Sequence, residues 1–167
     1  FTTLGEMTDD LFESLGVKFL WGFPNQNSEY GYVHKLHWES DHRMAGFQIP
    51  VPGIPMEAIQ RKIGLGKRSQ QVIHQKLKPY LTDDRVPNSA ISPGFGGMVR
   101  DQDFYDYKSF SPNYMIRIAD SLVWIKPQGG LLVGDLEVQD EQQVLEVLKS
   151  LQTLSRTLGL NKIIIQC

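Results

Sequence analysis

The sequence predicts an α/β (α+β) fold in which helices flank a mixed central sheet. Two segments carry this prediction, because residues 1–23 and 140–165 each read as an amphipathic helix, a glycine and an apolar strand. A third observation is the run 114–138, where short apolar stretches alternate with turn residues, as in antiparallel strands. The repeated unit suggests two related halves, although helix–glycine–strand units are common in α/β proteins and the similarity is short.

The first copy of the unit begins at residue 1. Apolar residues that recur every three or four positions predict a helix with one stripe facing a core: Phe1, Leu4, Met7, Leu11 and Leu15. Gly16 follows where a left-handed helix end is needed, a conformation that glycine adopts without steric cost. The nearly continuous apolar run 17–23 then predicts a strand that is covered on both faces.

The second copy lies near the end of the sequence. Asp140 is placed to cap a helix that Gly159 ends, and residues 163–165 follow as a core strand. The apolar stripe of this helix consists of Val144, Val147, Leu148, Leu151, Leu154 and Leu158. Because the sequence opens inside a helix and closes on a core strand, we expect it to be part of a larger protein.

Composition narrows the function classes. The net charge of −2 over 167 residues gives no electrostatic reason to expect a nucleic-acid partner. No apolar stretch approaches the roughly 20 residues of a membrane span, so no membrane partner is expected. The single cysteine, Cys167, excludes a disulfide within the chain and favours a reducing, cytoplasmic location.

The middle of the chain reads as several short elements. Residues 47–49 predict an edge strand that ends at Pro50, since proline lacks the donor that a strand needs. Residues 56–81 predict a helical region that breaks near Gly64 and Gly66. Residues 82–113 hold few periodic apolar positions and predict a long loop.

The segment with the most chemical information is 19–38. The strand predicted over 17–23 is followed by Asn25 and Asn27, either of which could cap a short helix that runs to about Lys35. Polar caps that open a helix at the carboxyl end of a strand lie where open α/β sheets bind ligands.

This segment resembles a known family. The sequence Gly-Phe-Pro-Asn-x-Asn-Ser at 22–28, with Lys-Leu-x-Trp at 35–38, resembles the fifth strand and following helix of the GNAT acetyltransferases, especially a group of bacterial GNAT proteins. The resemblance covers residues 1–38 well and 114–167 weakly. It divides the chain into the C-terminal part of a first GNAT-like half (1–45), a linker with a helix and a long loop (46–113), and the start of a second half (114–167).

The resemblance implies an enzyme, an acyl-CoA-dependent N-acyltransferase. Acetyl-CoA would be the co-substrate, and a small-molecule or peptide amine would be the acceptor. Thr2 and Thr3, in the first turn of the family's acetyl-CoA helix, would bind phosphate. Asn25, Asn27 and Ser28 fall where the family contacts the pantetheine or the adenosine diphosphate arm.

Two departures from the family pattern affect these roles. The tyrosine that often protonates the leaving thiolate is replaced by Val33, so Tyr30 and Tyr32 become the candidate catalytic residues. The family's glycine-rich pyrophosphate loop would precede Phe1, and the corresponding residues of the second copy, 138–142, contain no glycine. We therefore expect the second half to be structural or to serve the acceptor. The sequence 61–66 spells a similar loop, but no strand is predicted before it, which favours a helix break.

Several alternatives stay open at this point. The chain could be a non-catalytic ligand-sensing or protein-interaction module, or an aminoacyl transferase that depends on charged tRNA, and a homodimer is compatible with either. Asp135 and Glu137 could supply a general base or be an exposed strand end. His34 and His37 could share a helix face, but no third metal ligand is evident. A group of aromatic residues could line an acceptor pocket or attach the long loop to the core: Tyr105, Tyr107, Phe110 and Tyr114.

Overall fold

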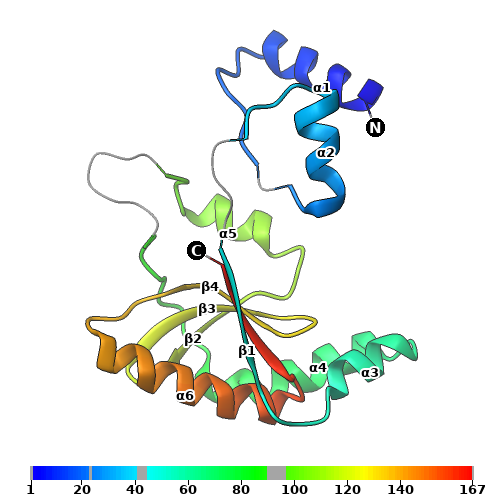
Figure 1. The fold of residues 1–167 in the computed structure, drawn as a ribbon. Helices are drawn as coiled ribbons and strands as arrows, with labels where there is room; N and C mark the ends of the chain where they lie inside the picture. Colours follow the sequence, from blue (N-terminus) through cyan, green and yellow to red (C-terminus); the bar gives the residue numbers. More distant parts are fainter. Residues whose placement is uncertain (1, 23, 41–44, 90–96, 167) are drawn as a thin grey trace. The chain divides into compact units, whose positions relative to one another are not determined.

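The computed structural model describes residues 2–22, 24–40, 45–89 and 97–166, and its compact units are Phe1–Met44 and Ala45–Cys167 (Figure 1). The described part of the chain contains six α-helices and one five-stranded sheet, so the predicted α/β class is confirmed.

The first unit contains helices α1 (Thr2–Ser14) and α2 (Gln26–Lys35). Helix α1 ends as predicted: Gly16 has a φ of 74°, and its N–H donates to the Glu13 carbonyl over 2.9 Å. The two helices approach closely at Gly5, where an added Cβ would lie 2.5 Å from Leu36 Cδ1.

The buried strand predicted over residues 17–23 is wrong for its described part. Residues 17–22 form no strand, and Phe23 lies outside the described residues. Phe19 and Trp21 are 75% and 54% exposed. The described part of this unit contains no strand with which they could pair, so their apolar character alone does not produce a ladder. The predicted stripe of α1 is likewise exposed at Leu4, Met7, Leu11 and Leu15.

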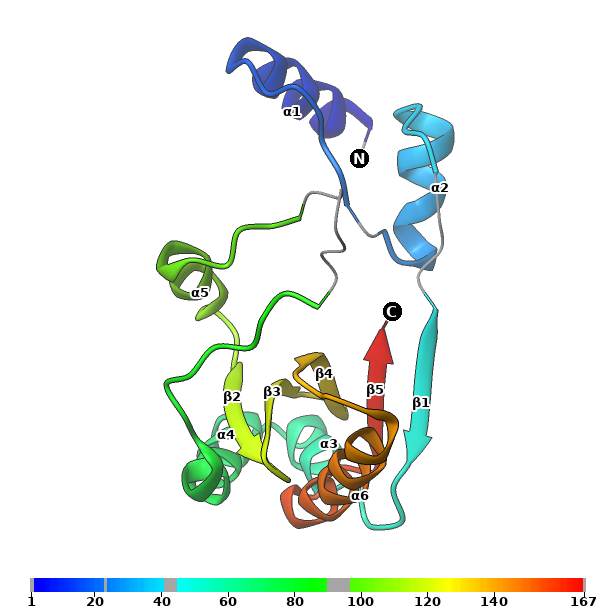
Figure 2. The same cartoon turned by 90° about the vertical axis from the view of Figure 1, so that its left-hand side faces the viewer.

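The second unit is built on a mixed sheet with the strand order β1-β5-β4-β3-β2. Its strands are β1 (Gly46–Pro50), β2 (Tyr114–Ile118), β3 (Ser121–Pro127), β4 (Leu131–Leu136) and β5 (Lys162–Gln166). Strands β2, β3 and β4 form an antiparallel meander, and helix α6 (Glu141–Leu158) leads to β5, which is parallel to β4. This confirms the antiparallel strands predicted over 114–138 and the helix and core strand predicted after them. Strand β1 pairs antiparallel with β5 (Figure 2), and its place at the edge of the sheet confirms the edge strand predicted over 47–49.

The segment 46–113, expected as a linker, supplies further elements of the second unit. Besides β1 it forms α3 (Met56–Lys62), α4 (Gly66–Leu77), the 3₁₀-helix η1 (Lys78–Tyr80) and α5 (Gln102–Lys108). The helix break predicted near Gly64 is confirmed, because this residue lies between α3 and α4 with a φ of 81°. The loop-like sequence 61–66 begins in the last turn of α3, so it follows a helix rather than a strand, as predicted. Helix α5 lies within the region expected as a long loop.

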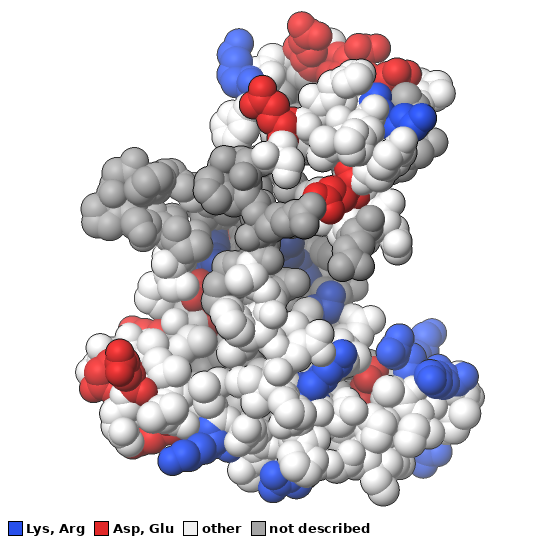
Figure 3. Space-filling model, in the orientation of Figure 1, with Lys and Arg blue, Asp and Glu red and all other residues white. Residues whose placement is uncertain are grey.

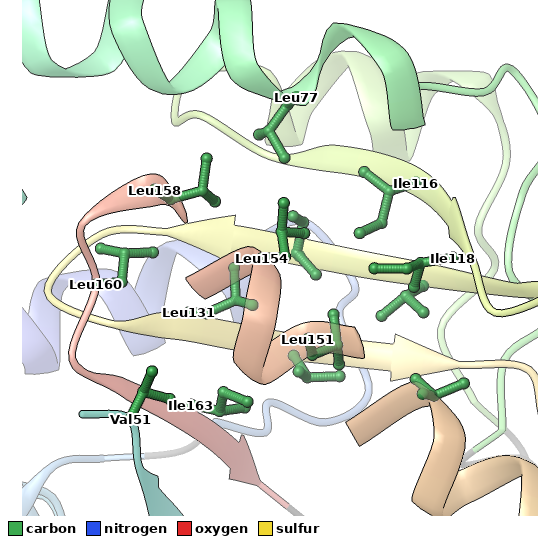
Figure 4. Close-up of a cluster of buried hydrophobic side chains, with 14 of the residues drawn as sticks. Val51, Leu77, Ile116, Ile118, Leu131, Leu151, Leu154, Leu158, Leu160 and Ile163 are labelled. Atoms are coloured by element: carbon green, nitrogen blue, oxygen red, sulfur yellow. The ribbon is translucent and has the colours of Figure 1, made fainter. Parts of the chain in front are cut away.

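One face of the sheet carries the main core, which α4 and α6 cover (Figures 1 and 4). The fully buried members of this core come from α4, α6 and four strands: Ile73, Leu77, Ile116, Val123, Ile125, Leu131, Val147, Leu151 and Ile163. The stripe predicted for α6 therefore packs as expected through Val147, Leu151, Leu154 and Leu158, whereas Leu148 and Val144 are only half-buried.

The opposite face of the sheet has a smaller apolar cluster. It consists of Val86, Met115 and Leu122, against which Tyr105 of α5 and Trp124 of β3 pack. Because side chains alternate between the faces of a strand, Trp124, Lys126 and Leu132 share this side of the sheet. We refer to it below as the α5 face.

A bulge interrupts the sheet between β3 and β4. Trp124 pairs with Asp135 and Ile125 pairs with Val133, which leaves Gly134 as an extra residue on β4. The parallel pairing of β4 with β5 ends at the same place, with Val133 opposite Ile165. A Cβ on Gly134 would lie 3.2 Å from Trp124 Cε3, so glycine allows the close approach of the indole. The bulge therefore directly follows the last residue pair that β4 shares with β5.

Candidate functional site

Three of the predicted cofactor-binding residues meet at the start of α2. Asn25 is the N-cap, and its Oδ1 accepts hydrogen bonds from the N–H groups of Asn27 (2.9 Å) and Ser28 (3.1 Å). In return, Ser28 Oγ accepts from the Asn25 N–H over 3.1 Å. This reciprocal arrangement is a capping box, which satisfies donors that the first turn of a helix otherwise leaves free. The polar residues of this motif therefore have a structural role whether or not they bind a ligand.

The other two predicted cofactor residues begin α1. Thr2 is the first residue of that helix, and Thr3, the next, is exposed. The first unit thus places its five predicted cofactor residues at the starts of two different helices.

The two candidate catalytic tyrosines point in different directions from α2. They are two residues apart, which places them about 200° apart around the helix axis. The ring of Tyr30 lies 4.8 Å from that of His34, and its side chain is 62% exposed. Tyr32 is half-buried, with its ring 4.8 Å from that of Trp38. Tyr30 is consequently the one whose hydroxyl a ligand can reach more easily.

The first unit also contains a pocket of about 380 Å³. It is lined by Asp9, Phe12, Glu13, Val17, Lys18, Phe19, Leu20, Trp38 and Glu39, none of which was predicted as a site residue. Three of these residues are acidic and one is basic, so the pocket repels rather than attracts a phosphate group.

A second pocket, of about 200 Å³, lies in the second unit beside the bulge. It is lined by Lys108, Phe110, Ser111, Asn113, Trp124, Ile125, Lys126, Leu132, Val133, Gly134 and Ile164. We call it the bulge pocket. Its lining includes the segment between α5 and β2 and the strands β3, β4 and β5. Of the aromatic residues that the sequence left with two alternative roles, Phe110 belongs to this lining, and its role in binding an acceptor stays a prediction.

Next to the bulge pocket, Asp135 of β4 is buried. Its carboxylate accepts hydrogen bonds from Arg100 Nη1 (2.6 Å), from the Ser89 N–H (3.1 Å) and from the Ser89 hydroxyl. The interpretation of Asp135 as an exposed strand end is therefore wrong. Because its oxygens already accept from Arg100 and Ser89, this carboxylate is poorly placed to take a proton from a substrate. Glu137 lies just beyond β4 and is exposed.

The predicted aromatic group separates into different roles. Tyr105 packs against the small cluster of Val86, Met115 and Leu122, and its ring centre lies 6.0 Å from that of Trp124. It therefore attaches α5 to the sheet. Arg100 extends the same contact, because its guanidinium lies 5.4 Å from the Trp124 ring centre. Tyr107 is exposed. Tyr114 packs against the main core, and burial raises the pKa of its phenol.

The start of α6 differs from a phosphate-binding helix start. Asp140 caps it by accepting from the Gln143 N–H over 2.8 Å, and Glu141 is the first helical residue. Negative side chains stabilise the positive end of a helix dipole but oppose a bound phosphate at the same place. Residues 138–142 also contain no glycine. Both observations argue against a phosphate site at the start of α6.

Outside the two pockets, the described surface also carries a group of positive charges. Lys and Arg side chains gather over α3 and α4 (Figure 3), and they include Arg61, Lys62, Lys67 and Arg68. Arg61 pairs with the buried Glu57 over 3.4 Å, so part of this charge is neutralised. Within the described ranges, no three His, Cys, Asp or Glu side chains are grouped to hold a metal ion. None of the helices described has the length and apolar character that a membrane crossing requires.

Comparisons with models of protein families, with curated proteins and with solved structures find no match for this chain.

Proposed function

We propose that this chain acts in acyl-CoA-dependent N-acyl transfer, with acetyl-CoA as co-substrate and an amine as acceptor. The first unit would bind acetyl-CoA and the second would bind the acceptor. The observation that carries this assignment is the bulge pocket, a cavity of small-molecule size beside the bulge of β4. The acidic start of α6 supports the same division, since it disfavours the phosphates of acetyl-CoA in the second unit. The single cysteine favours the cytoplasm as the place of this activity.

The reaction requires positioning more than a complex set of catalytic groups. The neutral amine nitrogen attacks the thioester carbonyl, a C–N bond forms, the C–S bond breaks, and CoA leaves as a thiolate. A proton donor near the departing sulfur protonates the thiolate, and the proton that the amine loses restores this donor, directly or through water. Holding the amine against the thioester supplies much of the rate enhancement, and a proton donor near the sulfur adds to it. We assign that donor to Tyr30, because it is more exposed than Tyr32.

Acetyl-CoA would contact Thr2 and Thr3 at the start of α1, and Asn25, Asn27 and Ser28 at the start of α2. Helix N-termini favour phosphate because their free N–H groups and the helix dipole present positive charge. The capping box limits this at α2, since the Asn25 side chain already accepts from two of those N–H groups. Co-substrate contact at α2 therefore has to involve the Asn25 amide nitrogen or the Asn27 side chain.

Isothermal titration of acetyl-CoA into the chain tests the assignment. Asn25→Asp is the informative variant, because aspartate caps a helix as well as asparagine but adds a negative charge. We expect unchanged far-UV circular dichroism and acetyl-CoA binding at least tenfold weaker. Asp101→Asn, the reverse exchange at the cap of α5 in the second unit, is the control and should bind as the wild type does. Equal affinity of Asn25→Asp and wild type would show that Asn25 only caps the helix.

A specific observation also favours a second candidate, a GNAT-like module that binds a ligand or a protein without catalysis. The polar groups of Asn25 and Ser28 are already engaged with one another, and α6 begins with acids. Mass spectrometry of mixtures with acetyl-CoA and a panel of amines separates the candidates. An N-acetylated product and free CoA in equal amounts support transfer. Ligand binding without either product supports the module.

A further inference from the structure

The lining of the bulge pocket is positively charged. Two of its eleven lining residues are lysines, Lys108 and Lys126, and none is acidic. Neither lysine forms an ion pair with a carboxylate of the described residues. The adjacent carboxylate, Asp135, is already paired with Arg100. We propose that the amine acceptor carries an anionic group, a carboxylate, which Lys126 and Lys108 bind. This proposal rests on the acyltransferase function proposed above.

Lys126 is the better placed of the two cations. It lies on β3 opposite Leu132, so its half-buried aliphatic part lies on the α5 face among the apolar residues that line the pocket. Lys108 ends α5, and its ammonium lies 5.6 and 5.7 Å from the ring centres of Phe104 and Tyr107. An anion in a partly desolvated pocket gains more from two ammonium groups than it would on an open surface.

The rest of the lining suits a small amine with an apolar body. Trp124, Leu132 and Ile164 supply an apolar surface. The side-chain N–H groups of Asn113 donate to the carbonyls of Lys108 (2.9 Å) and Ser111 (3.0 Å). No described residue donates a hydrogen bond to Asn113 Oδ1. That oxygen can accept a hydrogen bond from an amine. A volume of about 200 Å³ fits a molecule of amino-acid size rather than a folded peptide segment.

The same lysines also act on the amine that reacts. Two nearby positive charges disfavour a protonated amine and so lower its pKa, which increases the neutral fraction that can attack a thioester. They repel polyamines and lysine-rich peptides for the same reason. The pocket chemistry therefore selects acceptors in which an amine and a carboxylate are carried by one small molecule.

Two fluorescent probes of nearly equal shape test the charge selection: 2-aminobenzoate, which carries a carboxylate, and 2-aminobenzamide, which is neutral. We expect 2-aminobenzoate to bind at least tenfold more tightly than 2-aminobenzamide, and Lys126→Gln to weaken 2-aminobenzoate at least tenfold. Lys108→Gln should act in the same direction. Lys149→Gln, on the exposed surface of α6, is the matched control and should bind as wild type. Equal binding of the two probes, no binding of 2-aminobenzoate at millimolar concentration, or unchanged binding to both pocket variants would overturn the proposal.

Saturating acetyl-CoA distinguishes this proposal from the function on which it rests. If acetyl-CoA displaces 2-aminobenzoate competitively, the lysines bind co-substrate phosphate and the proposal fails. If spermidine, a cationic probe, is acetylated faster than anionic amines, the transferase function holds and the acceptor class is wrong. Lysine-dependent binding of 2-aminobenzoate with no acetylated product from any amine would support the anion-binding pocket and count against the transferase function.

Discussion

Replacing Asp135 by alanine should destabilise the second unit strongly. The carboxylate is buried and accepts hydrogen bonds from Arg100 Nη1 at 2.6 Å and from the Ser89 N–H at 3.1 Å. Alanine leaves the Arg100 side chain, only 15% exposed, without its counter-ion. Removing one partner of a buried ion pair costs about 3–5 kcal/mol, because the other charge stays desolvated. That is a large fraction of the roughly 5–15 kcal/mol by which a domain is stable.

A second pair in the same unit provides the control. Arg117 Nη2 and Asp84 Oδ2 are also 2.6 Å apart, but these side chains are 51% and 58% exposed. The hydrogen bond from Arg117 lowers the pKa of Asp84, so the pair is formed at neutral pH. Water replaces the lost partner of an exposed charge. Asp84→Ala should therefore shift the unfolding midpoint far less than Asp135→Ala, although the two pairs have the same separation.

Urea unfolding, followed by tryptophan fluorescence and far-UV circular dichroism, measures both effects. With a slope of about 2 kcal/mol per M, the predicted loss for Asp135→Ala lowers the midpoint by roughly 2 M. The double variant Asp135→Ala/Arg100→Met should be more stable than Asp135→Ala alone, because it removes the unpaired charge as well. Similar midpoints for Asp84→Ala and Asp135→Ala would refute the argument that burial sets the cost.

Three further predictions concern helix ends, the main core and a buried phenol. Gly159→Ala should lower the free energy of unfolding in urea more than Gly16→Ala. Each glycine has a φ near +74°, a conformation that costs about 1–2 kcal/mol for alanine. At Gly159 the new Cβ would also lie only 2.9 Å from Met56 Cβ. Leu151→Ala should cost about 2–5 kcal/mol and Leu145→Ala far less, since the first leucine is fully buried and the second is 52% exposed. Burial raises the pKa of Tyr114, so its neutral form adds stability below about pH 10 that is lost as pH rises through the folded pKa. Tyr114→Phe should reduce this alkaline loss, and an unchanged pH profile would count against it.

The two copies of the helix–glycine–strand unit show what apolar periodicity can predict. It identified both helix ends correctly, because a left-handed glycine terminates each helix. It predicted the strand correctly only in the second copy, where residues 163–165 lie between β1 and β4 and pair with both. Residues 17–22 are also largely apolar, yet the described part of their unit contains no strand. A strand needs hydrogen-bonding partners, and the pattern of one segment does not tell whether partners exist.

The bulge pocket was harder to predict because its lining comes from segments far apart in the sequence. One local signal was present: Lys126 stands between Ile125 and Pro127 and follows the apolar run 122–125, where a lysine is unusual. The role of Asp135 had no such signal. Its partners, Ser89 and Arg100, belong to a region that reads as loop, and only the folded chain brings them to β4.

The charges of the second unit bear on which unit would bind the co-substrate and which the acceptor. The start of α6 carries Asp140 and Glu141, which oppose an anion there, whereas the bulge pocket presents Lys108 and Lys126. An anion bound by this unit would therefore lie on the α5 face rather than at the helix dipole. The phosphates of acetyl-CoA would then need helix N–H groups outside the second unit. The starts of α1 and α2 provide such groups with fewer opposing charges. The first turn of α1 has no acidic residue, and that of α2 has only Glu29. This contrast is why we assign the co-substrate to the first unit and an anionic acceptor to the second.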